Sequence, residues 1–318
     1  MVPASTRRRL LRAVGSTALA GLAGCTAPDV FGSDGPNREY TLTVDTVAAS
    51  PVEHALYEPS DDPLFGAPAR ETLANILPDG RHTTYGYRPV ADDAYVEHDG
   101  RYFQTAVVVT GSDPVERTLV RAEPLADDAT VPDDAVPVDS LDRPSARVAK
   151  ILHSYAQTGG EGGCADLLRD GAYVLRRPAE RESPLAAGTL DGRVVTMKPG
   201  GPWNYRIETE RRRLSETAYT TLALEVAPSR EQFREVVFDT RIDADLSGES
   251  LQADVRSTLD RARSRGRYVE TTPLSGPFEA LIDRLGLGTV DEAANGRLLW
   301  YDGSLYRYGL YVRETDRT

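Results

Sequence analysis

The chain has 318 residues, of which 37 are Lys or Arg and 49 are Asp or Glu, so its net charge is −12. Its 40% of hydrophobic residues is enough for a folded core and excludes general disorder, and its length fits one large domain or two ordinary ones. The acidic charge excludes nucleic acid as the expected partner, because it repels phosphate groups.

The first 24 residues have the pattern of an export signal. Arg7 and Arg8 stand in a Thr-Arg-Arg-Arg-Leu-Leu stretch that resembles the twin-arginine signal, and a weakly apolar segment over 13–23 is too short to span a membrane. It ends in Leu-Ala-Gly-Cys at 22–25, which resembles the lipobox where a lipoprotein signal is cleaved. We therefore expect a signal peptide over 1–24, a lipid on Cys25 and a flexible tether over 25–37. The alternative is an amphipathic N-terminal helix with a chance cysteine.

Removal of this signal makes the chain more acidic, because the signal contains four arginines and no acidic residue. The remaining chain has 33 basic and 49 acidic residues, so its net charge is −16. Two lysines in the whole chain and a large acid excess are typical of proteins in concentrated salt, where repulsion between carboxylates is screened. A GC-rich genome is the alternative cause of the low lysine content. With the twin-arginine stretch and the lipobox, this composition resembles the exported lipoproteins of haloarchaea. The resemblance implies an extracytoplasmic protein, anchored to the outer face of the cell membrane through Cys25, and implies no activity.

Amphipathic helices and strands follow one another through the body of the chain. Apolar residues at helical spacing predict helices over 69–77, 143–157, 230–238, 249–265 and 277–285, with Asp142 and Ser229 as two of the N-caps. Alternating or β-rich runs predict strands over 40–47, 102–110, 118–122, 203–210, 218–226 and 305–313. Because the order is not a regular βαβ alternation, we expect an α+β fold, a mainly antiparallel sheet with flanking amphipathic helices.

Three Asp-Gly pairs, at 99–100, 170–171 and 302–303, stand in similar frames that include tyrosines. Asp-Gly accepts the positive φ angles of a tight hairpin turn, so each pair predicts a hairpin. An amphipathic helix precedes each of them, which raises the hypothesis of repeated helix-plus-hairpin units. The alternative is that hairpins in any sheet protein look alike.

Residues 124–142 hold three prolines and many acids. This composition predicts a linker between an N-terminal α+β unit over 38–123 and a C-terminal α+β unit over 143–318. The alternative is a solvated loop within a single body.

No recognisable catalytic or metal-binding motif is present in the sequence. The four histidines, at 54, 82, 98 and 153, have no metal-ligand spacing, and no nucleophile or phosphate-binding pattern can be assigned. We therefore expect no metal and no cofactor, leave the catalytic residues unknown, and favour a protein that is not an enzyme. If Cys25 carries lipid, Cys164 has no disulfide partner in the chain and is expected to be buried and inert.

Aromatic residues are the remaining candidates for a site, since tyrosine outnumbers phenylalanine 15 to 6. A candidate binding surface combines Trp203, Tyr205, Trp300, Tyr301, Tyr306 and Tyr308. The alternative is an aromatic ladder that stabilises the sheet. The leading hypothesis is a non-catalytic envelope or interaction module whose partner is an envelope protein or a small-molecule ligand. The alternatives are a cell-surface hydrolase with a site from scattered residues and a solute-capturing lipoprotein.

Overall fold

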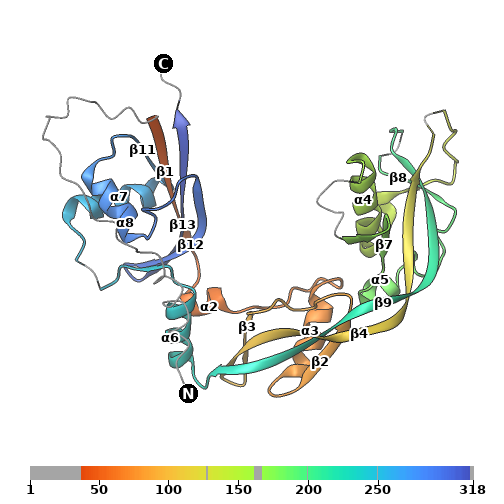
Figure 1. The fold of residues 1–318 in the computed structure, drawn as a ribbon, viewed down its shortest axis with the longest axis horizontal. Coiled ribbons are helices and arrows are strands. Elements are labelled where there is room, and N and C mark those ends of the chain that lie inside the picture. Colours follow the sequence, from red (N-terminus) through yellow and green to blue (C-terminus); the bar gives the residue numbers. More distant parts are fainter. Residues whose placement is uncertain (1–36, 127, 161–166, 199, 249, 316–318) are drawn as a thin grey trace, which may run out of the picture.

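The structure is a computed structural model, and it describes residues 37–315 except 127, 161–166, 199 and 249. The fold is α+β, as the sequence predicted, with two mostly antiparallel sheets that carry helices on their faces (Figure 1). The predicted signal with Arg7 and Arg8, the lipid site Cys25, and Cys164 lie outside the described residues. Within the described part, no helix is long and apolar enough to cross a membrane.

The first sheet has five strands and joins both ends of the described chain. Its strand order is β10-β12-β13-β1-β11, and every neighbouring pair is antiparallel except β10 with β12. The bounds are Asn37–Val47 for β1, Ala244–Asp245 for β10, Arg267–Thr271 for β11, Ala293–Tyr301 for β12 and Ser304–Thr315 for β13. Asn37 at the start of β1 lies opposite Thr315 at the end of β13, so the chain enters and leaves at the same end of this sheet.

Two helices, α7 (Ala253–Arg265) and α8 (Gly276–Arg284), cover one face of the five-stranded sheet (Figure 1). Leu42 of β1 and Leu310 of β13 are paired and both wholly buried, and Leu259 and Leu281 from the two helices join them in one core. These residues follow the strand period of two and the helix period of 3.6, so one apolar face meets another.

The second sheet has eight strands, and its centre is a long two-stranded ribbon. The order is β5-β8-β9-β4-β7-β6, with β2 added to β9 and β3 added to β4. The bounds are Arg81–Tyr85 for β2, Tyr95–His98 for β3, Arg101–Pro124 for β4, Val136–Pro137 for β5, Leu168–Arg169 for β6, Ala172–Val174 for β7, Val194–Thr196 for β8 and Asn204–Ala227 for β9.

Strands β4 and β9 have 24 residues each and pair along almost their whole length, from Tyr102 opposite Ala227 to Pro124 opposite Tyr205. The sequence predicted two shorter strands in each place. Gly111 and Pro114 fall between the two predicted strands, and Gly111 takes its positive φ at a register shift beside Val109, which is a bulge. Pro114 lies opposite Ser215 of β9, between the stretches of β4 that pair with β3 and with β7, so the other edge of β4 has no described strand beside it there.

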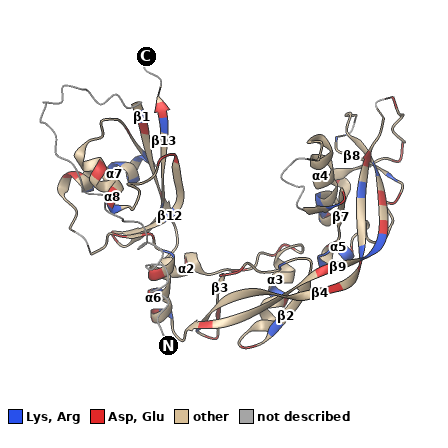
Figure 2. Cartoon of the chain, viewed as in Figure 1, with Lys and Arg blue, Asp and Glu red and all other residues tan. Residues whose placement is uncertain are grey.

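Charged side chains of opposite sign face each other along this ribbon, where Figure 2 shows both colours interleaved. Glu123 lies opposite Arg206, Arg121 opposite Glu208 and Glu116 opposite Arg213. Cross-strand pairs of this kind stabilise a sheet modestly and explain how a ribbon with little apolar cover keeps its register. Arg206 and Arg213 of β9 thus face carboxylates of β4, whereas Arg212 lies opposite Arg117 and pairs with Asp170 at 3.3 Å.

Helices cover the second sheet in separate places. Short α2 (Pro51–Ala55) and α6 (Arg230–Thr240) pack on the β3–β4 hairpin, where Phe233 stacks on Tyr102 with ring centroids 4.3 Å apart. α3 (Gly66–Ile76) lies against β2 and β9. α4 (Arg143–Gln157) and α5 (Pro178–Arg181) pack near β7 at the other end of the ribbon (Figure 1).

Each of the three predicted Asp-Gly hairpins is present, and each has a two-residue turn. Both turn residues have positive φ in every case, for example 51° at Asp302 and 69° at Gly303, as a type I′ turn requires. The hairpins are β3–β4, β6–β7 and β12–β13. In the first, the longer helix on the hairpin is α6, which comes after it in the chain, so the hypothesis of repeated units stays a prediction.

Strand pairing crosses the segment 124–142 that the sequence suggested as a linker or a loop. β1 and β4 come from 38–123, but they pair with β13 and β9 from 143–318. The segment itself contains β5 and a short 3-10 helix at Val138–Ser140. The two sheets thus each combine residues from both sides of it.

Candidate functional site

The aromatic residues predicted to form a binding surface lie at two distant places. Trp203 comes just before β9 and Tyr205 lies at its start, beside α4. Trp300, Tyr301, Tyr306 and Tyr308 lie on the five-stranded sheet at the opposite end of the molecule (Figure 1). They cannot form one continuous surface.

On the five-stranded sheet, Tyr306 and Tyr308 share one face, as predicted, but that face is covered by helices and leaves them 3% and 1% exposed. The Tyr308 hydroxyl donates to the Leu285 carbonyl at 2.8 Å, and burial raises its pKa to about 12. Trp300 is half-buried and meets the ring of Phe238 edge-on. Because their rings are engaged in the core, Tyr306 and Tyr308 are not available as a binding surface.

At the end of the molecule near α4, Trp203 is 43% exposed and lies beside a group of hydrogen-bonded polar side chains. Its ring and that of His153 have centroids 5.4 Å apart, with a tilt of 50° between the planes. Tyr205 is 2% exposed, and its hydroxyl lies 2.6 Å from His153 Nδ1 and accepts from Gln157 Nε2 at 3.2 Å. We call His153, Gln157, Trp203 and Tyr205 the tryptophan–histidine site.

Helix α4 and strand β9 position this site through their ordinary periods. α4 buries Val148 and Leu152 against the sheet, which puts His153 on the flank of the helix. His153 and Gln157 are four residues apart and so lie on the same side of α4, where both reach Tyr205. Burial lowers the pKa of His153, which favours the neutral ring. Helical spacing could have indicated the pair, but nothing in the sequence placed it against β9.

A second polar group, which the sequence reasoning missed, is buried where α5 meets the middle of the ribbon. Arg117 of β4 and Glu216 of β9 are each 4% exposed at their side chains, with Arg117 Nε 3.5 Å from Glu216 Oε1. Arg117 also donates to the Tyr85 carbonyl at 2.7 Å, and Arg176 Nε donates to Glu216 at 3.1 Å. Burial lowers the pKa of Arg117, and Glu216 opposes that shift. A side chain on Gly86, at φ +77°, would collide with the Glu216 carboxylate.

Glu180, whose side chain is 1% exposed, continues this group. Its carboxylate accepts from the backbone N–H groups of Arg176 and Arg177, both at 2.9 Å, and from the Tyr173 hydroxyl at 2.7 Å. Arg147 of α4 donates to the same hydroxyl at 2.7 Å and lies 3.6 Å from Glu180. Burial and the neighbouring Glu180 raise the pKa of Tyr173 to about 12. We call Arg117, Arg147, Tyr173, Arg176, Arg177, Glu180 and Glu216 the arginine–glutamate cluster. Hydrogen bonds and ion pairs among these groups join α4, α5 and the ribbon, although Arg117 Nε itself has no hydrogen-bond partner among the described residues.

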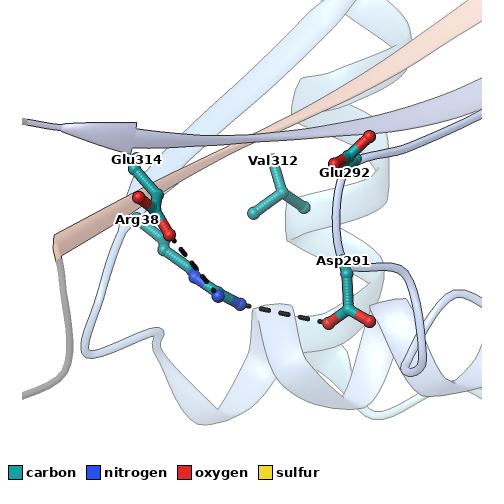
Figure 3. A pocket seen from close by; sticks show the side chains of 5 residues that line it. All are labelled: Arg38, Asp291, Glu292, Val312 and Glu314. Carbon is teal, nitrogen blue, oxygen red and sulfur yellow. Dashed lines mark ion pairs between the residues drawn. The ribbon is translucent and has the colours of Figure 1, made fainter.

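An open hollow of ≈ 570 Å³ lies beside the five-stranded sheet, near the point where the chain enters it (Figure 3). Arg38 points across it and pairs with Asp291 at 4.0 Å and with Glu314 at 3.7 Å. Glu292 and Val312 complete the lining. Acidic side chains outnumber the one arginine. Because Asp291 is fully exposed to water, its ion pair with Arg38 contributes little stability.

The histidines do not come together with carboxylates in a metal-binding group. His98 lies beside Asp99 at 3.5 Å, in the first hairpin turn, and His153 belongs to the tryptophan–histidine site. Across the described ranges, no three His, Cys, Asp or Glu side chains form a group that could hold a metal ion.

Comparison with known proteins adds no assignment. No family model matches the chain, and neither a curated protein nor a solved structure matches it.

Proposed function

We propose that this chain is a lipid-anchored, extracytoplasmic binding module that does not itself catalyse a reaction. The predicted twin-arginine signal with Arg7 and Arg8 and the predicted lipid on Cys25 supply the export and the anchor. The observation that carries the binding role is the exposed Trp203, whose ring lies beside that of His153 at the end of the molecule opposite the entry of the chain (Figure 1).

The arrangement of the two ends supports a projecting role. The tether leads into β1, in the five-stranded sheet, so a lipid on Cys25 would hold that end near the membrane. The ribbon leads from there towards the tryptophan–histidine site, and 24 residues at about 3.4 Å each correspond to about 80 Å of strand. A binding end carried away from the membrane fits a partner in the cell envelope, either an envelope protein or a small-molecule ligand.

Anchoring is tested by replacing Cys25 with alanine and fractionating the cells. We expect the Cys25→Ala chain in the soluble fraction and wild-type chain in the membrane fraction. Cys164→Ala is the matched control and should remain with the membrane. Membrane attachment of Cys25→Ala equal to wild type would contradict the lipid anchor.

Binding is tested with the soluble Cys25→Ala chain added to envelopes from cells that lack the gene. Saturable retention is expected, and retention without saturation, or none, would contradict a binding module. The same mixture reports on catalysis. Release of soluble envelope fragments that grows with incubation time would favour the hydrolase alternative instead.

A further inference from the structure

We propose that the tryptophan–histidine site binds a neutral saccharide ring, an inference that rests on the binding role proposed above and names its ligand class. The site offers two complementary features on neighbouring rings, whose centroids are 5.4 Å apart: an exposed indole and a fixed hydrogen-bond donor. Each follows from contacts that the structure shows.

The donor follows from the single proton of the Tyr205 hydroxyl. This buried hydroxyl accepts from Gln157 Nε2 at 3.2 Å, and among the described residues His153 Nδ1, at 2.6 Å, is the one acceptor in reach of its own proton. Nδ1 is then the acceptor, and the neutral ring carries its hydrogen on Nε2. Among the residues that the structure describes, no group accepts from this Nε2–H. The buried tyrosine thus fixes a donor on the ring that neighbours Trp203.

The platform is the indole of Trp203, which is 43% exposed and tilted 50° from the His153 ring. The face of an indole carries partial negative charge, and the C–H groups on one face of a pyranose carry partial positive charge, so the two attract each other as the ring stacks. The hydroxyl groups at the edge of the same sugar can accept from the Nε2–H of His153. A saccharide therefore uses both features at once.

Other ligand classes use only one feature. An apolar chain would cover the indole but leave the Nε2–H without an acceptor, which opposes its burial. A cationic ligand would be attracted by the indole face but would meet the partial positive charge of the same N–H. These two classes serve as competitors in the test.

The test uses tryptophan fluorescence, because the chain has only two tryptophans. Trp300→Phe leaves Trp203 as the sole reporter in the otherwise complete, soluble Cys25→Ala chain. This variant is titrated with neutral oligosaccharides of glucose, galactose and N-acetylglucosamine, and with tetramethylammonium and decanoate as competitors. We expect a saturable change in the Trp203 emission with at least one saccharide and with neither competitor.

Calorimetry on chains that retain Trp300 then assigns the contacts. Trp203→Ala and His153→Ala should each raise the Kd for that saccharide about tenfold. Tyr205→Phe keeps the ring but removes the hydroxyl that fixes the tautomer, so it should raise the Kd by a smaller factor and change the nitrogen NMR signal of His153. Tyr311→Ala is the matched control, because Tyr311 is 36% exposed but lies on the five-stranded sheet. It should leave the Kd unchanged.

No saturable response to any saccharide would overturn the proposal, as would an equal Kd for Trp203→Ala and wild type, or saturation by decanoate or tetramethylammonium instead. If the soluble Cys25→Ala chain is still retained on envelopes in those cases, the saccharide assignment fails while the binding role stands. If the Cys25→Ala chain is not retained at all, the binding role itself fails.

Discussion

Replacing Glu216 by glutamine removes one charge from the arginine–glutamate cluster while keeping the shape of the side chain. Arg117 and Glu216 are each 4% exposed at their side chains, so the charge left on Arg117 would have no solvent to compensate it. Arg176, at 21%, has some access to water and can turn outward. Loss of one partner of a buried pair costs about 3–5 kcal/mol. We expect a loss near the lower limit, about 3 kcal/mol, because Arg117 keeps its bond to the Tyr85 carbonyl.

The assay is urea unfolding of both chains at one salt concentration, followed by circular dichroism, with the free energy taken from the midpoint and slope. Asp139→Asn is the matched control. Its pair with Lys150 has the same 3.1 Å separation as Arg176 and Glu216, but the two side chains are 57% and 82% exposed. An exposed pair of this kind contributes less than about 1 kcal/mol, so the two variants separate the effect of burial from that of distance.

A second variant distinguishes an unpaired charge from a general packing defect. Arg117→Met combined with Glu216→Gln removes the charge that the single variant leaves uncompensated, so the double variant should be more stable than Glu216→Gln alone. A loss below about 1 kcal/mol for Glu216→Gln, or an equal loss for Asp139→Asn, would refute the reasoning.

Three further outcomes follow from single contacts. The pKa of Tyr308 is raised to about 12 in the folded chain, against an ordinary value of 10.0. The stability that the protonated Tyr308 hydroxyl contributes is therefore complete below pH 10 and is lost as the pH rises towards 12. Tyr308→Phe should therefore flatten the alkaline loss of stability in urea titrations between pH 9 and pH 12, and an unchanged slope would contradict it. Gly303→Ala, at φ +69°, should cost about 1 kcal/mol or more in the same assay, whereas Gly276→Ala, in open space at the start of α8, should cost less than half as much. Phe233→Ala removes a fully buried ring stacked on Tyr102 and should lower stability by about 3–5 kcal/mol in thermal unfolding, and a loss under 1 kcal/mol would contradict that packing.

Local signals in the sequence predicted the local parts of the fold. The helix over 143–157 has the bounds expected, and the Ser229 side chain caps α6 by accepting from the Gln232 backbone at 3.4 Å. Asp142 is the N-cap residue of α4 but makes no side-chain capping bond. The Asp-Gly turns were predictable because the required φ angles depend on the two turn residues alone.

Long-range pairing could not be predicted in the same way. Nothing near Leu42 indicates that its partner is Leu310, because a strand's pattern shows which residues share a face but not which strand lies beside it. The continuous β4–β9 ribbon could not be predicted for a related reason. Its middle has little apolar cover, so the residues between the predicted strands, which include Gly111 and Pro114, show no alternating apolar pattern.

The candidate sites show the same limit. In the sequence, Tyr306, Tyr308 and Trp203 were equally good candidates for an exposed aromatic surface. Helices cover the first two and leave the third exposed, because tertiary packing decides which face is buried. The arginine–glutamate cluster draws its members from α4, from α5 and from positions 117 and 216 on two strands. Isolated charged residues at such distances give no motif, so only the fold could bring them to notice.

The cluster and the tryptophan–histidine site are linked through the ribbon. A two-stranded ribbon is marginal by itself and needs a covering layer. α6 covers one end of β4–β9, and α4 covers the other, around Val120 and Ile207. Between these apolar regions, the ribbon carries the buried charged pair of Arg117 and Glu216, and Arg176 lies against it and pairs with Glu216. Loss of Glu216 should therefore loosen the position of the α4 end relative to the five-stranded sheet without changing His153 and Trp203. Glu216→Gln should then bind a soluble ligand at that site as wild type does, while its retention on intact envelopes falls.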